Sequence, residues 1–234
     1  MRGTFYIRFG KRGVDAISSF VGIMLLAPLF AAVAIAVKLS SSGPVFFRQV
    51  RTGQFEKPFR IFKFRTMRVA DPAGPGALLT AAGDSRITRL GALLRKTKID
   101  ELPQLFNVLL GHMSLVGPRP EVPIYTAKFD ERQKQIFRAK PGITGPSANA
   151  YEEELMASHP DKEYFYLSTV MPAKVEIDLV YCQNIEFLED LSVICSTGGT
   201  MFRRVLELAK VLPDRAVERA AGHKRRTSSE GRVA

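Results

Sequence analysis

The chain has 234 residues, enough to bury a hydrophobic core, and its length fits one large domain or one domain with appendages. Its 34 Lys and Arg outnumber 23 Asp and Glu, and the resulting net charge of +11 favours an anionic partner: nucleic acid, an acidic membrane surface or a phosphorylated substrate. The two cysteines, Cys182 and Cys195, have no partners at metal-binding spacing, which argues against a zinc or disulfide framework and favours a reduced, cytosol-facing protein.

The first predicted element is an uncharged apolar segment at residues 16–37. A helix of this length, at about 1.5 Å per residue, just spans a hydrocarbon core of about 30 Å. Pro28 lies in the middle, where it removes a backbone donor and predicts a kink. Basic residues flank both ends, so the positive-inside rule gives no clear orientation for a spanning helix. From the residues alone, a transmembrane span and a re-entrant helix with both ends on the cytoplasmic face stay open.

Residues 45–51 and 58–64 are two β-prone runs with a short loop between them, which predicts a β-hairpin. The window 38–68 around them carries eight Lys or Arg and one Glu, so seven of the eleven net positive charges lie here. Phenylalanines are interleaved with these cations, a mixture that fits either base stacking or a hairpin near lipid headgroups. A Pro/Gly/Ala loop is predicted next, at 71–84.

Two helices are expected after this loop. Asp84 or Ser85 can cap a helix that continues to residue 96 with one apolar face. A second helix is expected from about 101 to 110, ended by Gly111.

The C-terminal half is predicted to be helical as well. A charged helix is expected at 128–140, and about two helices are expected at 171–210. Beyond Leu212 the chain is polar and basic, which predicts a disordered tail.

An Asp-Glu pair, Asp100 and Glu101, directly precedes the second of these helices. The simpler interpretation is that Asp100 caps the helix, which is worth about 1 kcal/mol, and that Glu101 complements the helix dipole. The functional interpretation uses the same position, because a helix N-terminus keeps a carboxylate ionised as a nucleophile and favours phosphate oxygens nearby. Glu101 could then help to hold Mg²⁺, which prefers oxygen ligands. Local sequence leaves both interpretations open.

Phosphate chemistry also needs cations that neutralise the charge of the transferred group. Each cation is by itself more often a solvated surface charge, because most Lys and Arg side chains are exposed. Prolines on both sides of Arg119 fix its backbone and favour bidentate phosphate contact. The candidate phosphate-binding residues are Lys63, Arg65, Arg95 and Arg119.

Several long motifs follow one another along the chain: KRGVDAISS with LLAPLF, GPVFFRQVRTG, KPFRIFKFRTM, DSRITRLGALLRKTKIDELPQLFNVLLGHMSLVGPRPE and KPGITG. In this order they resemble the bacterial sugar transferase family, the monotopic polyprenyl-phosphate phosphoglycosyl transferases, in its minimal form. The likeness covers roughly residues 8–205. The W-A-Q-V and G-R-N motifs of many members are missing after P-G-I-T-G, and an acidic stretch at Tyr151–Leu155 and a P-x-K segment at Pro172–Lys174 stand instead. This departure from the family pattern leaves the identity of the transferred sugar open.

The resemblance implies a ping-pong reaction. Asp100 would attack the β-phosphate of a nucleotide-diphosphate sugar, with a UDP-sugar as the expected donor, UMP would leave, and the phosphosugar would stay on the aspartate. Undecaprenyl phosphate would then accept it and so prime glycan or exopolysaccharide synthesis. Asp100 and Glu101 would hold Mg²⁺, and the phosphates would be contacted by Lys63, Arg65, Arg95 and Arg119. The family also favours the re-entrant helix, although the Ser-Pro of several members is Ala27-Pro28 here.

Together these observations predict a mostly helical α+β fold with a re-entrant membrane helix, amphipathic interfacial helices and a small β-hairpin. The expected parts are a basic N-terminus with the membrane helix at 1–40, a catalytic domain at 41–212 and a disordered tail at 213–234. The protein is expected to be monotopic in the bacterial inner membrane, in contact with lipids, with the catalytic domain facing the cytoplasm. No nucleic-acid partner is expected, since no recognition motif is present. A homodimer stays open, and the alternative function is an inactive membrane-anchored scaffold of a glycan-assembly complex.

Overall fold

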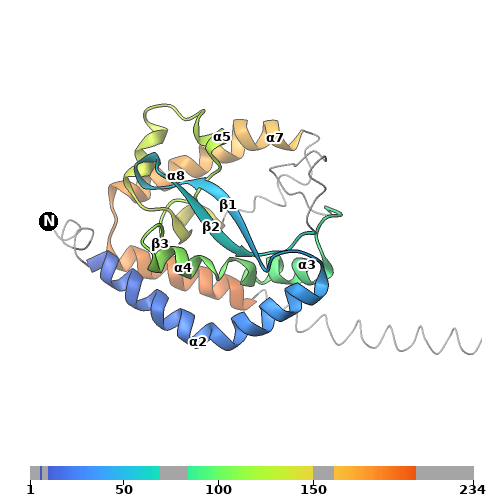
Figure 1. The fold of residues 1–234 in the computed structure, drawn as a ribbon. Coiled ribbons are helices and arrows are strands. Elements are labelled where there is room, and N and C mark those ends of the chain that lie inside the picture. Colours follow the sequence, from blue (N-terminus) through green and yellow to red (C-terminus); the bar gives the residue numbers. More distant parts are fainter. Residues whose placement is uncertain (1–5, 7–9, 69–83, 150–160, 204–234) are drawn as a thin grey trace, which may run out of the picture. The chain divides into compact units, whose positions relative to one another are not determined.

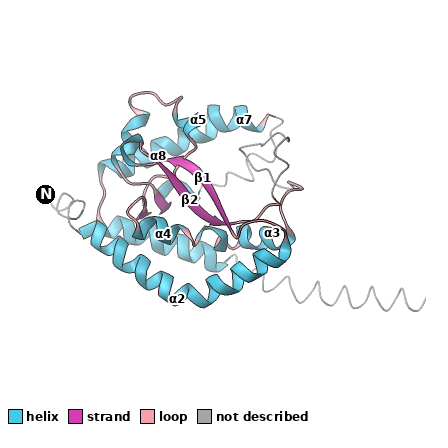
Figure 2. Cartoon of the chain, viewed as in Figure 1, coloured by secondary structure: helices cyan, strands magenta, loops and turns pink. Residues whose placement is uncertain are grey.

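The computed structural model describes residues 6, 10–68, 84–149 and 161–203. The predicted loop at 71–84, apart from Asp84, the acidic stretch at 151–155 and the tail at 213–234 lie outside the described residues. The chain divides into two units, Met1–Thr197 and Gly198–Ala234, and the site discussed below lies wholly in the first. The described part is mostly helical with two small sheets, which confirms the predicted α+β class (Figure 2).

The longest element is α2, Lys11–Ser40, which continues through Pro28 and is bent in Figure 1. Proline explains such a bend because it removes one backbone donor and its ring displaces the preceding turn. Of the described helices, α2 alone is long and apolar enough to cross a membrane. One face packs on the protein through Asp15, Ser19, Val33 and Val37. The opposite face exposes Val14, Ile17, Phe20, Val21, Met24, Leu25, Ile35 and Leu39.

Both ends of α2 are fastened to the same compact unit. At its N-terminal end, the Arg12 guanidinium donates to the carbonyl oxygens of Val108 and Leu109 at 2.6 and 2.8 Å. At its C-terminal end, the buried Arg65 guanidinium donates to the carbonyl oxygens of Val37, Ser41 and Ser42 at 3.2, 2.7 and 2.8 Å. These cations bind carbonyl groups at or just beyond a helix C-terminus, that of α4 in the first case and that of α2 in the second, where intrahelical donors are lacking.

The predicted hairpin is confirmed as β1, Phe46–Thr52, antiparallel to β2, Pro58–Phe64, with Phe46 opposite Phe64. The turn between them is η2, Gln54–Glu56, whose Phe55 and Glu56 have positive φ angles. A second sheet, which the sequence analysis did not predict, pairs β3, Ser114–Val116, in parallel with β4, Gly142–Thr144. It brings the segment after β3 against the P-G-I-T-G motif.

The first helix after the hairpin is shorter than predicted. It is α3, Arg89–Lys96, and Thr88 caps it by accepting a hydrogen bond from the Gly91 amide at 2.9 Å. The prediction of Asp84 or Ser85 as the cap was wrong. Asp84 instead binds the Arg86 guanidinium, and the residues after it form a turn that leads Ile87 into a β-bridge with Met67.

The next helical stretch is split between η3, Ile99–Glu101, and α4, Gln104–Leu109. Its end was predicted correctly, since Gly111 follows α4 with φ +84°, in the left-handed region that glycine adopts without strain. The N-terminal part was expected to be continuous helix and is a separate turn.

Among the remaining elements, α8 packs on η4 and η6, and α5 contacts β1. The predicted helix at 128–140 is only a six-residue 3₁₀ turn, because Asp130 and Gln133 cap each other at its start and Phe129, Ile136 and Phe137 turn into the core. Two helices in the C-terminal half are confirmed. The bounds are α5 Pro123–Thr126, η4 Gln133–Arg138, η5 Pro146–Asn149, α7 Lys162–Phe165, η6 Tyr166–Val170, α8 Met171–Gln183 and a helix at 187–203.

Candidate functional site

Asp100 lies in the η3 turn and does not cap α4, so its predicted capping role was wrong. Pro103 occupies the cap position, and the turn begins after Lys98, which has the unusual φ of 58°. The left-handed residue redirects the chain, so the Asp100 side chain is turned inward and is only 7% exposed. Its Oδ1 atom has no hydrogen-bond partner among the described residues. A buried carboxylate oxygen without a partner is costly and marks a site where a ligand or ion would be accommodated.

The two carboxylates of the pair have opposite pKa shifts. Burial raises the pKa of Asp100 to about 6, the negative charge of Glu101 adds to this, and Lys63, Lys98 and Arg95 counteract it. For Glu101, burial also raises the pKa, but Lys63 and Arg119 outweigh burial and hold the pKa well below its usual range. Two adjacent carboxylates with separated pKa values are typical of sites in which each has its own role.

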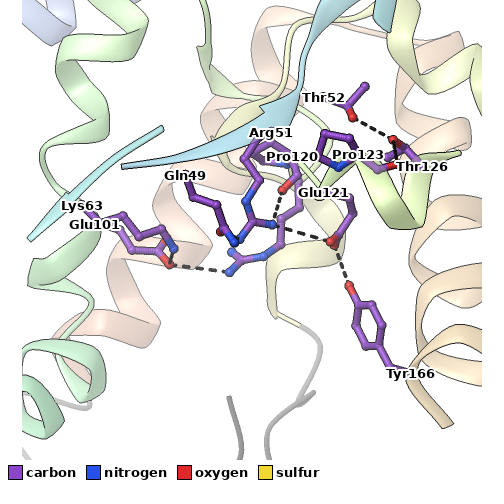
Figure 3. Close-up of polar contacts among 11 residues, drawn as sticks. Gln49, Arg51, Thr52, Lys63, Glu101, Pro120, Glu121, Pro123, Thr126 and Tyr166 are labelled. Atoms are coloured by element: carbon purple, nitrogen blue, oxygen red, sulfur yellow. Dashed lines mark hydrogen bonds and ion pairs between the residues drawn. The ribbon is translucent and has the colours of Figure 1, made fainter. Parts of the chain in front are cut away.

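Glu101 is held by cations from two distant parts of the chain. Its Oε1 atom accepts a hydrogen bond from Lys63 Nζ at 2.8 Å, and Arg119 Nη2 lies 3.6 Å from the same oxygen (Figure 3). Lys63 comes from β2 and Arg119 from the G-P-R-P segment that follows β3. The fold therefore brings together three of the predicted site residues around one carboxylate oxygen.

The other two predicted cations have different places. Arg95 lies in the last turn of α3, and its charge is among those that lower the pKa of Asp100. Arg65 is buried against the C-terminal end of α2, and none of its described contacts is to Asp100 or Glu101. Its guanidinium has a structural role there, and its phosphate contact stays a prediction.

A second carboxylate centre, which was not predicted from the sequence, lies beside the first. Tyr166 Oη donates to Glu121 Oε1 at 2.6 Å, and Arg51 Nη1 lies 3.7 Å from Glu121 Oε2 (Figure 3). Arg51 is the second-last residue of β1 and Glu121 directly follows G-P-R-P, so both belong to motifs that were already noted. Each of the two residues could therefore be picked out from its motif, but only the fold shows that Arg51 and Glu121 form a pair.

A third buried polar group lies on α8. Burial lowers the pKa of Lys174 to about 8, and burial raises the pKa of Asp178 to about 6. Ser147 Oγ donates to Asp178 Oδ2 at 2.9 Å, and Arg119 contributes to the electrostatic environment of both side chains. Lys174 is the lysine of the P-x-K segment that distinguishes this chain in sequence.

The residues available for a metal ion are few. Within residues 6, 10–68, 84–149 and 161–203, no group of three or more His, Cys, Asp or Glu side chains could hold a metal. The two carboxylates of Asp100 and Glu101 are enough for a cation that takes one or two protein carboxylates and completes its coordination shell with water and phosphate oxygens, as Mg²⁺ does. The unpartnered Asp100 Oδ1 is the oxygen that such an ion would use.

The arrangement can stabilise negative charge next to the Asp100 carboxylate. The Asp100 carboxylate lies in a largely water-excluded turn, where its charge is less well solvated than on the surface. Lys63, Arg95 and Arg119 surround the pair with positive charge. Such a set suits attack on a phosphorus atom, since the transferred group carries charge that fixed cations can neutralise.

Comparisons with known proteins agree on one family. A family model described as bacterial sugar transferase matches residues 6–204. A UDP-N-acetylgalactosamine-undecaprenyl-phosphate N-acetylgalactosaminephosphotransferase of Aeromonas hydrophila is 38% identical over 196 residues, which cover 82% of this chain and 44% of that protein. A UDP-glucose:undecaprenyl-phosphate glucose-1-phosphate transferase of Xanthomonas campestris pv. campestris is 38% identical over 197 residues, covering 82% and 39%.

A relative of more similar length is the exopolysaccharide production protein PSS of Rhizobium leguminosarum bv. phaseoli, 38% identical over 194 residues, which cover 80% of this chain and 92% of that protein. The chain spans less than half of the length of the Aeromonas and Xanthomonas relatives. The family match nevertheless includes α2, the hairpin, the Asp-Glu pair and α8. The chain therefore belongs to the bacterial sugar transferase family.

Proposed function

We propose that the protein transfers a sugar phosphate from a nucleotide-diphosphate sugar, a UDP-sugar in the first instance, to undecaprenyl phosphate, and so primes exopolysaccharide or other glycan synthesis. The observation that carries the proposal is the buried Asp100 carboxylate, with an unpartnered oxygen, beside a Glu101 that Lys63 and Arg119 hold ionised. Membership of the family and the names of the relatives support the substrate classes.

The reaction proceeds in two displacements. An Asp100 carboxylate oxygen attacks the β-phosphorus of the donor, and the bond from this phosphorus to the oxygen bridging to the α-phosphate breaks. The electron pair leaves with UMP, and the sugar phosphate is joined to Asp100 as an acyl phosphate. A phosphate oxygen of undecaprenyl phosphate then attacks the same phosphorus, the bond to Asp100 breaks, and the carboxylate is regenerated together with a lipid-linked diphosphate sugar.

The other residues of the site act on charge. Lys63 and Arg119 keep Glu101 ionised, and together with Arg95 they lie where diphosphate oxygens would need neutralisation. Mg²⁺, held by Asp100 and Glu101, would supply further neutralisation of the diphosphate and polarise its oxygens. The G-P-R-P segment limits the backbone motion of Arg119, so its guanidinium loses little freedom when it binds phosphate.

The membrane arrangement is part of the proposal. The helix α2 enters the cytoplasmic leaflet and returns, with its exposed apolar face in lipid and both ends at the cytoplasmic surface. The attachment of both ends to one compact unit, through Arg12 and Arg65, supports this arrangement. The bend of α2 and its largely exposed apolar residues support it as well. In this position the catalytic unit would meet the phosphate of the lipid acceptor at headgroup level.

The proposal is tested with purified protein, Mg²⁺ and a panel of nucleotide-diphosphate sugars. With donor and no lipid acceptor, one equivalent of nucleoside monophosphate is expected per enzyme, and the peptide containing Asp100 gains the mass of the sugar phosphate. Adding undecaprenyl phosphate restores turnover.

The key variant is Asp100→Asn, which is expected to lower nucleotide release by about 10⁴-fold, as loss of a nucleophile does in other enzymes. Asp130→Asn is the matched control, because Asp130 is exposed and its capping contact to the Gln133 amide can be made by asparagine as well. An Asp100→Asn protein that folds and still forms the covalent adduct would refute the assignment of the nucleophile.

A further inference from the structure

Glu121 lies two residues after Arg119, and its carboxylate is held from two sides. Tyr166 on η6 donates to Oε1 at 2.6 Å, and Arg51 at the end of β1 forms an ion pair with Oε2 at 3.7 Å. The Glu121 side chain is 13% exposed, so this carboxylate is mostly removed from water. A charged group with so little exposure is retained only where its partners compensate for the lost hydration.

The same arginine also fixes the backbone of this segment. Arg51 Nη1 donates to the Pro120 carbonyl oxygen at 3.0 Å, and its Nη2 donates to Gln49 Oε1 at 2.8 Å. The neighbouring Thr52 amide donates to the Glu121 carbonyl oxygen at 2.9 Å. The end of β1 thus contacts both residues that follow Arg119 (Figure 3).

Two arginines and two carboxylates lie near one another here, and each arginine has a different carboxylate within ion-pair distance. Arg119 has Glu101 at 3.6 Å, and Arg51 has Glu121 at 3.7 Å. The two guanidinium groups lie close enough to repel each other, and Glu101 also attracts Arg51. If Glu121 were uncharged, Arg51 would have Glu101 as its remaining carboxylate neighbour, in competition with Arg119.

We infer that Glu121 and Arg51 are positioning residues: their ion pair, completed by Tyr166, keeps Arg119 directed at Glu101 and available to a diphosphate. The role rests on the proposed function for its substrate, but its geometry concerns only the binding of a phosphate anion. Arg119 then owes its orientation to side chains from β1 and η6 in addition to its two flanking prolines.

The direction in which loss of the Glu121 charge changes phosphate binding separates the positioning role from a through-space charge effect. Removing a negative charge near a phosphate site makes binding of an anion tighter if the charge acts only through space. Removing it makes binding weaker if the charge holds a phosphate-binding arginine in place, because the arginine must then be ordered at the moment of binding.

The probe is inorganic pyrophosphate with Mg²⁺, titrated calorimetrically into the full chain in detergent micelles. Glu121→Gln is expected to weaken pyrophosphate binding by about tenfold, and Tyr166→Phe to weaken it by about threefold, since only one hydrogen bond to Glu121 is lost. Glu131→Gln is the control, as Glu131 is exposed and pairs only with Lys134 among the described residues. Unchanged or tighter binding in Glu121→Gln would overturn the inference.

A double-mutant cycle with Arg119→Met identifies the residue through which Glu121 acts. In the Arg119→Met background, Glu121→Gln is expected to change the dissociation constant by less than about twofold, because the arginine to be positioned is gone. A full tenfold effect in that background would show that Glu121 acts by another route. Thermal unfolding of each variant checks the fold, and Tyr166→Phe keeps the test valid if Glu121→Gln does not fold.

Failure of the proposed function looks different from failure of this inference. A wild-type protein that binds pyrophosphate but releases no nucleotide from any donor refutes the proposed reaction, while the binding series still decides the role of Glu121. A wild-type protein with no measurable pyrophosphate binding overturns the positioning role itself. If nucleotide release is present and Glu121→Gln leaves pyrophosphate affinity unchanged, the reaction stands and the inference fails.

Discussion

Lys63 and Glu101 form an ion pair of 2.8 Å across 38 positions of sequence, and this pair joins β2 to the turn that carries Asp100. Both side chains are mostly buried, with 18% and 13% exposure. Burial lowers the pKa of Lys63, while Glu101 acts in the opposite direction and stabilises the ammonium form. The pair therefore connects the stability of the hairpin with the charge state of the site.

Replacing Lys63 with methionine is expected to cost about 3 kcal/mol in the free energy of unfolding, because among the described residues Glu101 then keeps Arg119 as its one ion-pair partner. Nucleotide release should fall as well, since the pKa of Glu101 rises when Lys63 no longer lowers it. Urea denaturation and the release assay measure the two effects. Lys134→Met is the control, because its pair with Glu131 is exposed and worth little. A fully active, fully stable Lys63→Met protein would contradict the pairing.

Arg65→Met separates a structural role from phosphate binding. The variant loses three hydrogen bonds from a buried guanidinium to carbonyl oxygens in the last turn of α2 and just after it, and a loss of about 3 kcal/mol in unfolding free energy is expected. Arg60→Met, at an exposed position of β2, the strand that precedes Arg65, should change stability little. Denaturation curves and pyrophosphate binding are measured together. Weaker pyrophosphate binding with unchanged stability would instead support a direct phosphate contact of Arg65.

Asp178 predicts a pH dependence of stability. Its pKa is about 6 in the folded chain, above the usual value of 3.8, because burial favours the neutral form. The folded state then binds more protons than the unfolded state between these values, so the contribution of Asp178 to stability is greatest below about pH 4 and is lost as pH rises through about 6. The expected loss is about 3 kcal/mol at neutral pH.

Asp178→Asn should reduce this dependence, since asparagine cannot ionise and can still accept from Ser147, while Asp100, whose pKa burial also raises to about 6, keeps its own contribution. Unfolding temperature measured from pH 4 to 7 is expected to decline less in the variant than in the wild type. Asp130→Asn, at an exposed position, should keep the wild-type slope. The same slope in Asp178→Asn would mean that another group titrates in this range.

The path of α2 can be tested by labelling single cysteines at its two ends. Gly13 and Ser42 are exposed, and both should be modified by an impermeant thiol reagent from the cytoplasmic side in a Cys195→Ser background. Labelling is measured in inverted and right-side-out membrane vesicles. Reaction of the two positions from opposite sides would show a spanning helix. A cysteine at Phe55, the exposed hairpin tip that the proposal places in the cytoplasm, reports the side on which the catalytic unit lies.

Local sequence determined the elements whose signal is continuous along the chain. The uncharged run at 16–37 became the core of α2, because a long apolar stretch satisfies its backbone most simply as a helix. The β-prone runs at 45–51 and 58–64 became β1 and β2, since their short connection lets them pair locally. The long motifs also identified the family and directed attention to Asp100 and Glu101.

Tertiary structure decided what local propensity could not. The preference of aspartate for helix caps predicted the wrong role for Asp100, because the left-handed turn at Lys98 and the proline at 103 moved the start of α4 past it. The helix predicted at 128–140 shortened to a 3₁₀ turn because its aromatic residues are buried against α8. The pairs Lys63–Glu101 and Arg51–Glu121 join residues far apart in sequence, and only packing of the hairpin against the segments after α3 and β3 brings their charges together.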